Sequence, residues 1–233
     1  MLAPNSFLTS FIRVPLNKMK SQKLKDIYYA SIGKLSIFPY FWHKARHPSK
    51  FYGAYVNIGC GPKYVAGMIN IDGNILYKKD IWLDVTLGLP FPDSSLKGVY
   101  VSHVLEHFSP QQLRNLLAEF YRVLQPGAGV RIVVPSLEYA VRAYQEEQGE
   151  KFSDWPEKYT SLGGRLNNFL LCANQHRLMF DFGFLAEFLR GAGFPEILRK
   201  SPFCSQVFGN EHLKQETDPA LLKTSLYVEA IKK

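Results

Sequence analysis

The sequence is poor in cysteine and has no long apolar run. Its 233 residues include three cysteines, Cys60, Cys172 and Cys204, and no Cys-x-x-Cys pair. An odd count with this spacing disfavours a disulfide framework and a zinc ribbon, and we expect a reducing, cytoplasmic setting. No segment approaches the roughly 18 consecutive apolar residues that a membrane-spanning helix needs, and the N-terminus lacks the apolar core of a secretion signal. We therefore expect neither a membrane span nor secretion.

Acidic residues are almost absent from the first 50 positions. That segment has nine Lys or Arg residues against Asp26, whereas the 19 basic and 19 acidic residues that follow cancel, so the net charge of +8 belongs to residues 1–50. One interpretation is a cap over a site, or a patch for an anionic partner such as phosphate, nucleic acid or a membrane surface. The other is a solvated helix at about 21–35, ended by Pro39, that packs on the domain through its aromatic residues.

A glycine-rich turn follows the first short apolar run. Residues 55–58 are typical of a buried strand, and Gly59-Cys60-Gly61 lets the backbone adopt positive φ and approach a ligand closely. The turn lacks the third glycine of a dinucleotide fingerprint, because Tyr64 stands there, and Asp72 follows Gly61 after 11 residues instead of about 20. A ligand with one adenosine and no pyrophosphate fits this pattern better, and a purely structural turn is the alternative.

Three further apolar runs end at polar side chains. Residues 67–72 end at Asp72, residues 81–84 end at Asp84, and residues 98–102 are followed by His103. Ligands of open parallel sheets bind beyond the carboxyl ends of the strands, so we expect these side chains at one crevice. The remaining elements expected are helices at 109–124, 136–148, 166–173 and 183–189 and strands at 129–134, 196–199 and 225–231. This order predicts an α/β fold with parallel crossovers.

Six motifs together resemble those of class I S-adenosylmethionine-dependent methyltransferases. They are Val-Asn-Ile-Gly-Cys-Gly (56–61), Ile-Asn-Ile-Asp (69–72), Asp84 with Leu-Pro-Phe-Pro-Asp-Ser-Ser-Leu (89–96), Val-Ser-His-Val-Leu-Glu-His (101–107), Phe-Tyr-Arg-Val-Leu-Gln-Pro-Gly (120–127) with Val-Arg-Ile-Val-Val-Pro (130–135), and Leu-Arg-Gly-Ala-Gly-Phe (189–194). The likeness covers roughly residues 54–231. It is greatest to compact predicted methyltransferases of bacterial polysaccharide and sugar biosynthesis. It implies a Rossmann-like three-layer sandwich with a seven-stranded, mostly parallel sheet.

The resemblance also implies a role for each strand end. Gly59 and Gly61, with Cys60 between them, would approach the methionine part of S-adenosylmethionine, and Asp72 would bind its ribose hydroxyls. Asp84 would bind the adenine amino group, and His103 would lie beside the sulfonium. Asn57 occupies a cofactor-binding position where the superfamily usually has Asp or Glu. The first helix is nearly absent, so residues 1–50 are expected to cover the edge of the cofactor.

Histidines are the candidates for catalysis. Removal of a proton from a hydroxyl acceptor needs a base that titrates near neutral pH, and His107, His103 and His176 are the candidates. His103-Val-Leu-Glu-His107 also has the His-x-x-Glu-His spacing that binds zinc on a helix. A strand directly before it and a new helix at Ser109 argue against such a helix, so we expect no metal.

The sequence therefore predicts an arm at 1–50 and a methyltransferase domain at 51–233 with an insertion at about 149–180. The expected reaction is methyl transfer from S-adenosylmethionine to a small-molecule or glycan-type acceptor, at oxygen. One alternative is a catalytically weak binding module of the same fold. The other is a nucleic-acid methyltransferase that uses the basic arm, for which no base-flipping motif is present.

Overall fold

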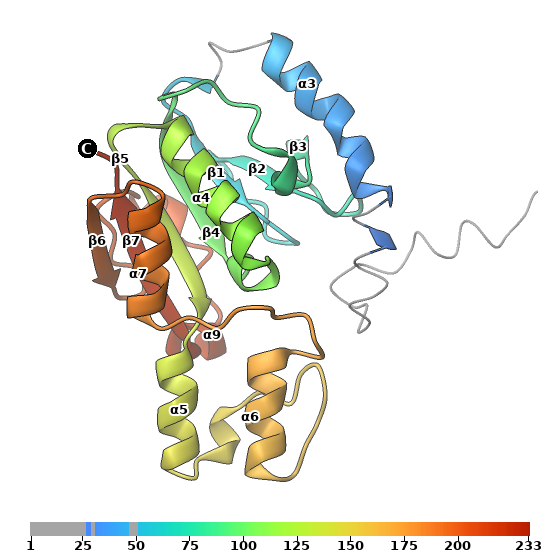
Figure 1. Ribbon diagram of the computed structural model, residues 1–233, viewed down its shortest axis with the longest axis vertical. Coiled ribbons are helices and arrows are strands. Elements are labelled where there is room, and N and C mark those ends of the chain that lie inside the picture. Colours follow the sequence, from blue (N-terminus) through green and yellow to red (C-terminus); the bar gives the residue numbers. More distant parts are fainter. Residues whose placement is uncertain (1–26, 29–30, 47–50) are drawn as a thin grey trace, which may run out of the picture.

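In the computed structural model, the described residues are 27–28, 31–46 and 51–233, and they contain one seven-stranded sheet of order β3-β2-β1-β4-β5-β7-β6 (Figure 1). The strands are β1 (Tyr55–Ile58), β2 (Ile69–Asp72), β3 (Ile81–Trp82), β4 (Leu96–Ser102), β5 (Leu124–Pro135), β6 (Glu196–Lys200) and β7 (Ser225–Ile231). The first five are mutually parallel, and β7 runs antiparallel to both β5 and β6. The predicted α/β architecture with a mostly parallel seven-stranded sheet is confirmed.

The sheet order reverses between β1 and β4, which are hydrogen-bonded neighbours. From β1 the chain proceeds outward through β2 and β3, and from β4 it proceeds the other way to β5. Such a reversal opens a crevice at the carboxyl ends of the two strands, where α/β proteins bind their ligands. The glycine turn after β1 and His103 after β4 both lie at this point.

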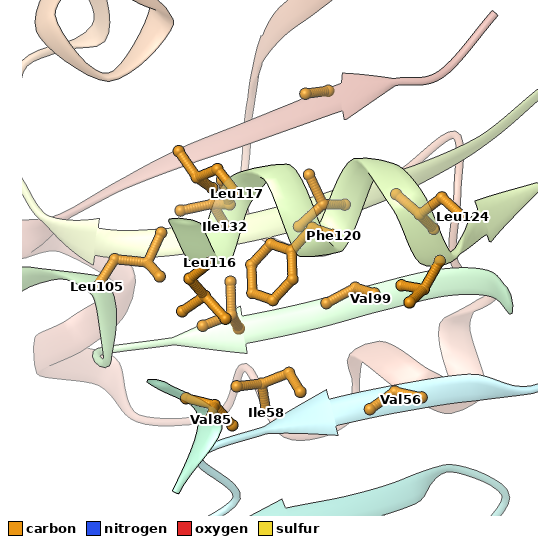
Figure 2. Close-up of a cluster of buried hydrophobic side chains, with 14 of the residues drawn as sticks. Val56, Ile58, Val85, Val99, Leu105, Leu116, Leu117, Phe120, Leu124 and Ile132 are labelled. Carbon is orange, nitrogen blue, oxygen red and sulfur yellow. The ribbon is translucent and has the colours of Figure 1, made fainter. Parts of the chain in front are cut away.

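One face of the sheet carries the main apolar core. Helix α4 (Pro110–Val123) begins with a capping box between Ser109 and Gln112. Its Leu116, Leu117 and Phe120 pack on the inward side chains of β1, β4 and β5 (Figure 2). Helix α7 (Phe182–Gly191) covers the same face further along. Side chains alternate across each strand, so the residues between these apolar ones point to the opposite face.

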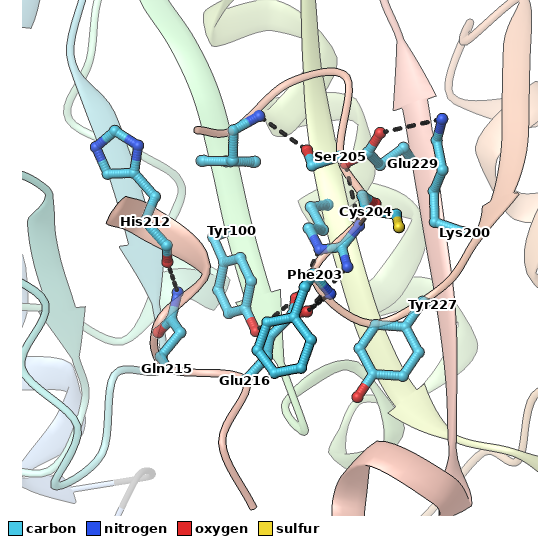
Figure 3. Close-up of polar contacts among 12 residues, drawn as sticks. Tyr100, Lys200, Phe203, Cys204, Ser205, His212, Gln215, Glu216, Tyr227 and Glu229 are labelled. Atoms are coloured by element: carbon cyan, nitrogen blue, oxygen red, sulfur yellow. Dashed lines mark hydrogen bonds and ion pairs between the residues drawn. The ribbon is translucent and has the colours of Figure 1, made fainter. Parts of the chain in front are cut away.

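The opposite face is covered by the β6–β7 connection, residues 201–224, which contains only the short helices α8 (Asn210–Leu213) and α9 (Pro219–Thr224). A buried charged network binds it to the sheet (Figure 3). All five N–H donors of Arg131 on β5 are used: two bind Glu216, one binds Glu229 on β7, and two bind the carbonyls of Ser201 and Cys204. The sequence predicts no helix or strand in this connection, because its apolar residues follow neither a helical nor a strand period.

Helix α5 (Leu137–Gln145) and the first part of the predicted insertion form a small helical unit beyond the end of the sheet (Figure 1). Helices α5 and α6 (Leu162–Leu171) flank the short turn η6 (Gly149–Lys151). They share a separate apolar cluster built around Ala140, Ala143 and Phe152. The helix expected at 166–173 therefore begins four residues earlier, at Leu162, where Ser161 caps it.

The prediction for the N-terminal arm falls mostly outside the described residues. Within them, Gly33–Ser36 forms the 3-10 turn η2 and Ile37–Arg46 forms helix α3. Pro39 was expected to end a helix, and this was wrong: it lies in the first turn of α3, where its missing N–H is not needed. The anionic partner expected for residues 1–50 stays a prediction. No helix in the described part of the chain is long and apolar enough to span a membrane.

Candidate active site

The glycine turn is fixed to the neighbouring strand by its backbone. The N–H groups of Gly59 and Cys60 both donate to the carbonyl of Ile71 on β2, at 2.8 and 3.1 Å. Gly59 has a φ of 65°, and a Cβ there would lie 2.3 Å from a methyl group of Val104. Gly59 is therefore required by packing as well as by its backbone conformation. Gly61 also has positive φ, and a Cβ there would meet no described atom within 4 Å.

Asp72 links the end of β2 to this turn. Its Oδ2 accepts the N–H of Gly61 at 2.7 Å, and its Oδ1 accepts the N–H of Asn74 at 2.6 Å. Burial raises the pKa of Asp72 above its ordinary value, although these two hydrogen bonds oppose the shift. Burial, followed by the charge of Asp72, raises the pKa of the Cys60 thiol to about 12. The thiol of Cys60 is therefore a neutral group at physiological pH and not a nucleophile.

Asn57 bonds to the connection between β1 and β2. Its amide donates to Oδ1 of Asn70 at 3.1 Å and to the carbonyl of Lys63. Asn70 in turn binds the backbone of Val65 and Met68. These two buried amides shape the short loop that takes the place of a first helix, whose near absence the sequence predicted.

The outer strands β2 and β3 bring further polar groups to the same edge. Oδ1 of Asp84 accepts hydrogen bonds from the N–H and the hydroxyl of Thr86, at 3.0 and 2.8 Å, and so caps the turn η4 (Val85–Leu87). Tyr28 donates its hydroxyl to the carbonyl of Gly73 at 3.0 Å, and Trp82 donates its indole N–H to the same oxygen. A residue of the N-terminal segment thus lies against the loop that follows Asp72.

All three candidate histidines gather around Glu106. His103 Nδ1 lies 3.4 Å from Glu106 Oε1, and one ligand atom from each of Glu106, His107 and His176 lies within 4.8 Å of the other two. Burial by itself raises the pKa of Glu106, but the contact with His103 and the charges of the surrounding imidazoles outweigh it and lower that pKa to about 2. Burial lowers the pKa of His176 to about 4, so its imidazole is neutral at physiological pH.

The chain brings these side chains together from two distant segments. His103 directly follows β4 with a φ of 54°, and its Nε2 lies 3.0 Å from the hydroxyl of Ser225 on β7. Glu106 and His107 follow in the turn η5 (Leu105–His107). His176 arrives from the far end of the insertion. A non-glycine residue at positive φ is strained, and such strain is common at functional sites.

A cleft of about 240 Å³, its open mouth included, is lined in part by residues that adjoin this cluster in the sequence. Ser102, directly before His103, lines it, and so do Leu221 and Leu222 of α9, the helix that leads into Ser225. Its polar lining also includes Lys63, Gln215 and Asp218. The sequence reasoning missed Ser225, the network around Arg131 and this cleft. Arg131, a charged residue within the apolar run 130–134, was the sign of this network in the sequence.

Residues 66–132 match a family model described as a methyltransferase domain. No curated protein sequence matches the chain. Among solved structures, the chain is similar to a methyltransferase from Thermotoga maritima described as a possible histamine N-methyltransferase (16% identity, TM-score 0.48, covering 93% of this chain and 99% of that one). It is also similar to an Archaeoglobus fulgidus methyltransferase (15%, 0.47, 90% and 99%) and to human N-acetylserotonin methyltransferase (11%, 0.47, 99% and 60%). At this identity the likeness concerns the fold.

The strand order and the crevice at its reversal define an α/β protein with a Rossmann-like fold, as predicted. Residues 66–132 match a methyltransferase domain, for which S-adenosylmethionine is the expected cofactor.

Proposed function

We propose that this chain transfers a methyl group from S-adenosylmethionine to a hydroxyl oxygen of a small-molecule or glycan-type acceptor. The observation that carries the proposal is the cluster of His103, Glu106, His107 and His176 at the carboxyl end of β4, beside the glycine turn of β1. A neutral amine attacks without prior loss of a proton, whereas a hydroxyl group needs a base. Histidines that converge on a carboxylate favour oxygen as the acceptor atom.

The residues at the other strand ends fit the cofactor. Each Asp72 oxygen accepts one backbone hydrogen bond, which leaves further lone pairs for the two ribose hydroxyls. The buried Nδ2 of Asn74, which has no hydrogen-bond partner among the described residues, adds a donor beside it. The open space at Gly61 would accept the methionine part next to Gly59 and Cys60. Asp84 would bind the adenine amino group, and Asn57 would support the turn through Asn70.

S-adenosylmethionine supplies, when bound, a methyl group made electrophilic by the positive charge on its sulfur. The chain's own part is to hold the acceptor in line and to accept its proton. His103 directly follows β4 at the crevice. Its Nε2 lies 3.0 Å from the hydroxyl of Ser225, and its Nδ1 lies 3.4 Å from Glu106 Oε1. The acceptor would lie at the cleft that begins at Ser102, where Lys63, Gln215 and Asp218 offer polar contacts.

Calorimetric titration with S-adenosylmethionine, followed by an assay with cofactor labelled in its methyl group, tests the proposal. We expect binding of one cofactor per chain and label transfer to an acceptor carrying a hydroxyl, but not to the matched acceptor in which an amine replaces that hydroxyl. Folded protein that does not bind the cofactor would contradict the proposal. Transfer to the amine alone would contradict the assignment to oxygen.

A further inference from the structure

The carboxylate of Glu106 is buried without a hydrogen bond. Its side chain is 1% exposed, and neither oxygen has a hydrogen-bond partner among the described residues. His103 Nδ1 lies 3.4 Å from Glu106 Oε1, but the geometry of this contact makes no hydrogen bond. A buried carboxylate has lost its water, and without a directed hydrogen bond both oxygens keep lone pairs that no group uses. A cation bound to Glu106 would use them.

Each of the two imidazoles beside Glu106 has one ring nitrogen held by a backbone carbonyl. His107 Nδ1 lies 2.9 Å from the carbonyl of Gln175, and His176 Nδ1 lies 3.1 Å from the carbonyl of Leu170. A carbonyl only accepts, so each Nδ1 carries the hydrogen and each Nε2 keeps its lone pair. A backbone carbonyl on the far ring nitrogen is a common way to fix the tautomer and direction of a metal-binding histidine.

We propose that Glu106, His107 and His176 bind one divalent transition-metal ion, with zinc the best match. One ligand atom from each lies within 4.8 Å of the other two. Zinc at about 2.0–2.2 Å from nitrogen and oxygen ligands in tetrahedral geometry sets these atoms roughly 3.3 Å apart, so the ligand atoms need to approach one another by at most about 1.5 Å. Two imidazoles and a carboxylate leave a fourth position for water or an acceptor oxygen.

The folded geometry explains why the sequence predicted no metal. The spacing His103-x-x-Glu106-His107 suggests a zinc site only if both histidines share one helix. In the structure His103 lies before η5, and its Nε2 contacts Ser225 instead. The second imidazole is His176, which comes from the end of the insertion and which no local spacing could reveal.

The role of the metal ion in catalysis rests on the proposed function. An ion at this position would hold the acceptor hydroxyl and make its proton more acidic. The binding itself is independent of the acceptor and is tested without activity.

The test uses the full chain, treated with a chelator and desalted, and titrated with Zn²⁺ by calorimetry and with Co²⁺ by visible absorption. We expect one equivalent of each ion to bind. Glu106→Gln and His176→Gln should each weaken binding by roughly 100-fold or more, since each removes one ligand. The matched control is His212→Gln, because His212 is also a buried histidine beside an acid, Glu211, but lies on the α8 helix. Its variant should bind as the wild type does.

Calorimetric titration of the same samples with S-adenosylmethionine separates this inference from the proposed function. Wild-type protein that binds the cofactor but no metal overturns the metal site and leaves the methyltransferase. Metal binding unchanged by both ligand variants also overturns it. If the variants do not fold, wild-type crystals grown with Zn²⁺ are tested by anomalous diffraction at the zinc edge. The proposal requires an anomalous peak between these three side chains, and the absence of a peak there would overturn it.

Discussion

The backbone N–H of Arg177 donates to the carbonyl oxygen of Glu106 at 2.7 Å, and the N–H of Leu178 donates to the same oxygen at 3.2 Å. This double contact ties the end of the insertion to η5, just beyond β4. His176 directly precedes Arg177, so the contact also determines where its imidazole lies. The histidine cluster is therefore assembled by main-chain hydrogen bonds between two segments far apart in sequence.

Removal of one of these N–H groups should loosen the cluster. Arg177→Pro deletes the donor, and we expect a loss of about 1–3 kcal/mol in unfolding free energy together with reduced methyl transfer, because the buried carbonyl of Glu106 loses its shorter bond. Arg177→Ala keeps the N–H and is the matched control. Urea unfolding and the labelled-methyl assay measure both effects. Equal losses in the two variants would show that the side chain, not the N–H, matters.

Even the small change of Asp72 to Asn should weaken cofactor binding. In Asp72→Asn, an NH₂ group replaces one carboxylate oxygen and cannot accept the hydrogen bond from the N–H of Gly61 or Asn74. The turn therefore loses one hydrogen bond as well as the negative charge. We expect roughly 10- to 100-fold lower affinity for S-adenosylmethionine, or about 1.4–2.8 kcal/mol, by calorimetry. Asp93→Asn, on an exposed side chain, is the control. Unchanged affinity in Asp72→Asn would remove Asp72 from the proposed site.

The strand ends were predictable because their signals are local, whereas the contacts that complete the site are not. An apolar run followed by Gly59-Cys60-Gly61, or by Asp72, identifies where a strand stops whatever packs on it. The need for glycine at position 59, by contrast, arises partly from the methyl group of Val104, a residue that follows β4 and would clash with a Cβ there. His176 depends on the return of the insertion. Such long-range contacts leave no period or spacing in the sequence.

The covering of the second face shows the same limit. A helix between β1 and β2 was correctly expected to be missing, because 10 residues, 59–68, separate the strands. The second face is covered by the β6–β7 connection instead, and this could not be foreseen, because Arg131 and not an amphipathic pattern holds that connection. The buried arginine was visible in the sequence, but its acidic partners were not.

Stability should depend on pH through Glu119. Burial by itself raises its pKa, but hydrogen bonds from Arg122 and from the N–H of Leu89 outweigh burial and hold that pKa below 4.5. A lowered pKa in the folded state contributes stability that is present above the unfolded value and is lost as the pH falls through the folded value. Glu119→Gln should therefore cost about 1 kcal/mol near neutral pH and progressively less in acid, because the wild-type carboxylate is protonated first in the unfolded chain and then, at lower pH, in the folded one.

Urea unfolding across a pH series measures this difference. Glu146→Gln is the control, because Glu146 forms an exposed ion pair with Lys151 at 3.4 Å, and such pairs contribute little. A Glu119→Gln cost that stays constant down to acid pH would contradict the assignment.

Arg131 should be the most sensitive polar position of the sheet. Its side chain is fully buried, and Glu216 and Glu229 are buried with it. Arg131→Met leaves two carboxylates in the interior, and within the described part of the chain only Lys200, at 3.8 Å from Glu229, remains to balance them. We expect a loss of about 3–5 kcal/mol, because removing one partner of a buried ion pair leaves an uncompensated charge.

The triple variant Arg131→Met with Glu216→Gln and Glu229→Gln isolates that cause. It removes the unbalanced charges while keeping similar volumes, so it should be more stable than Arg131→Met alone, as measured by urea unfolding. Its remaining deficit reports the lost hydrogen bonds to Ser201 and Cys204, which hold the connection over the second face. If the triple variant were the least stable, directed hydrogen bonds rather than charge balance would dominate, and the connection would owe its position to the geometry of the guanidinium group.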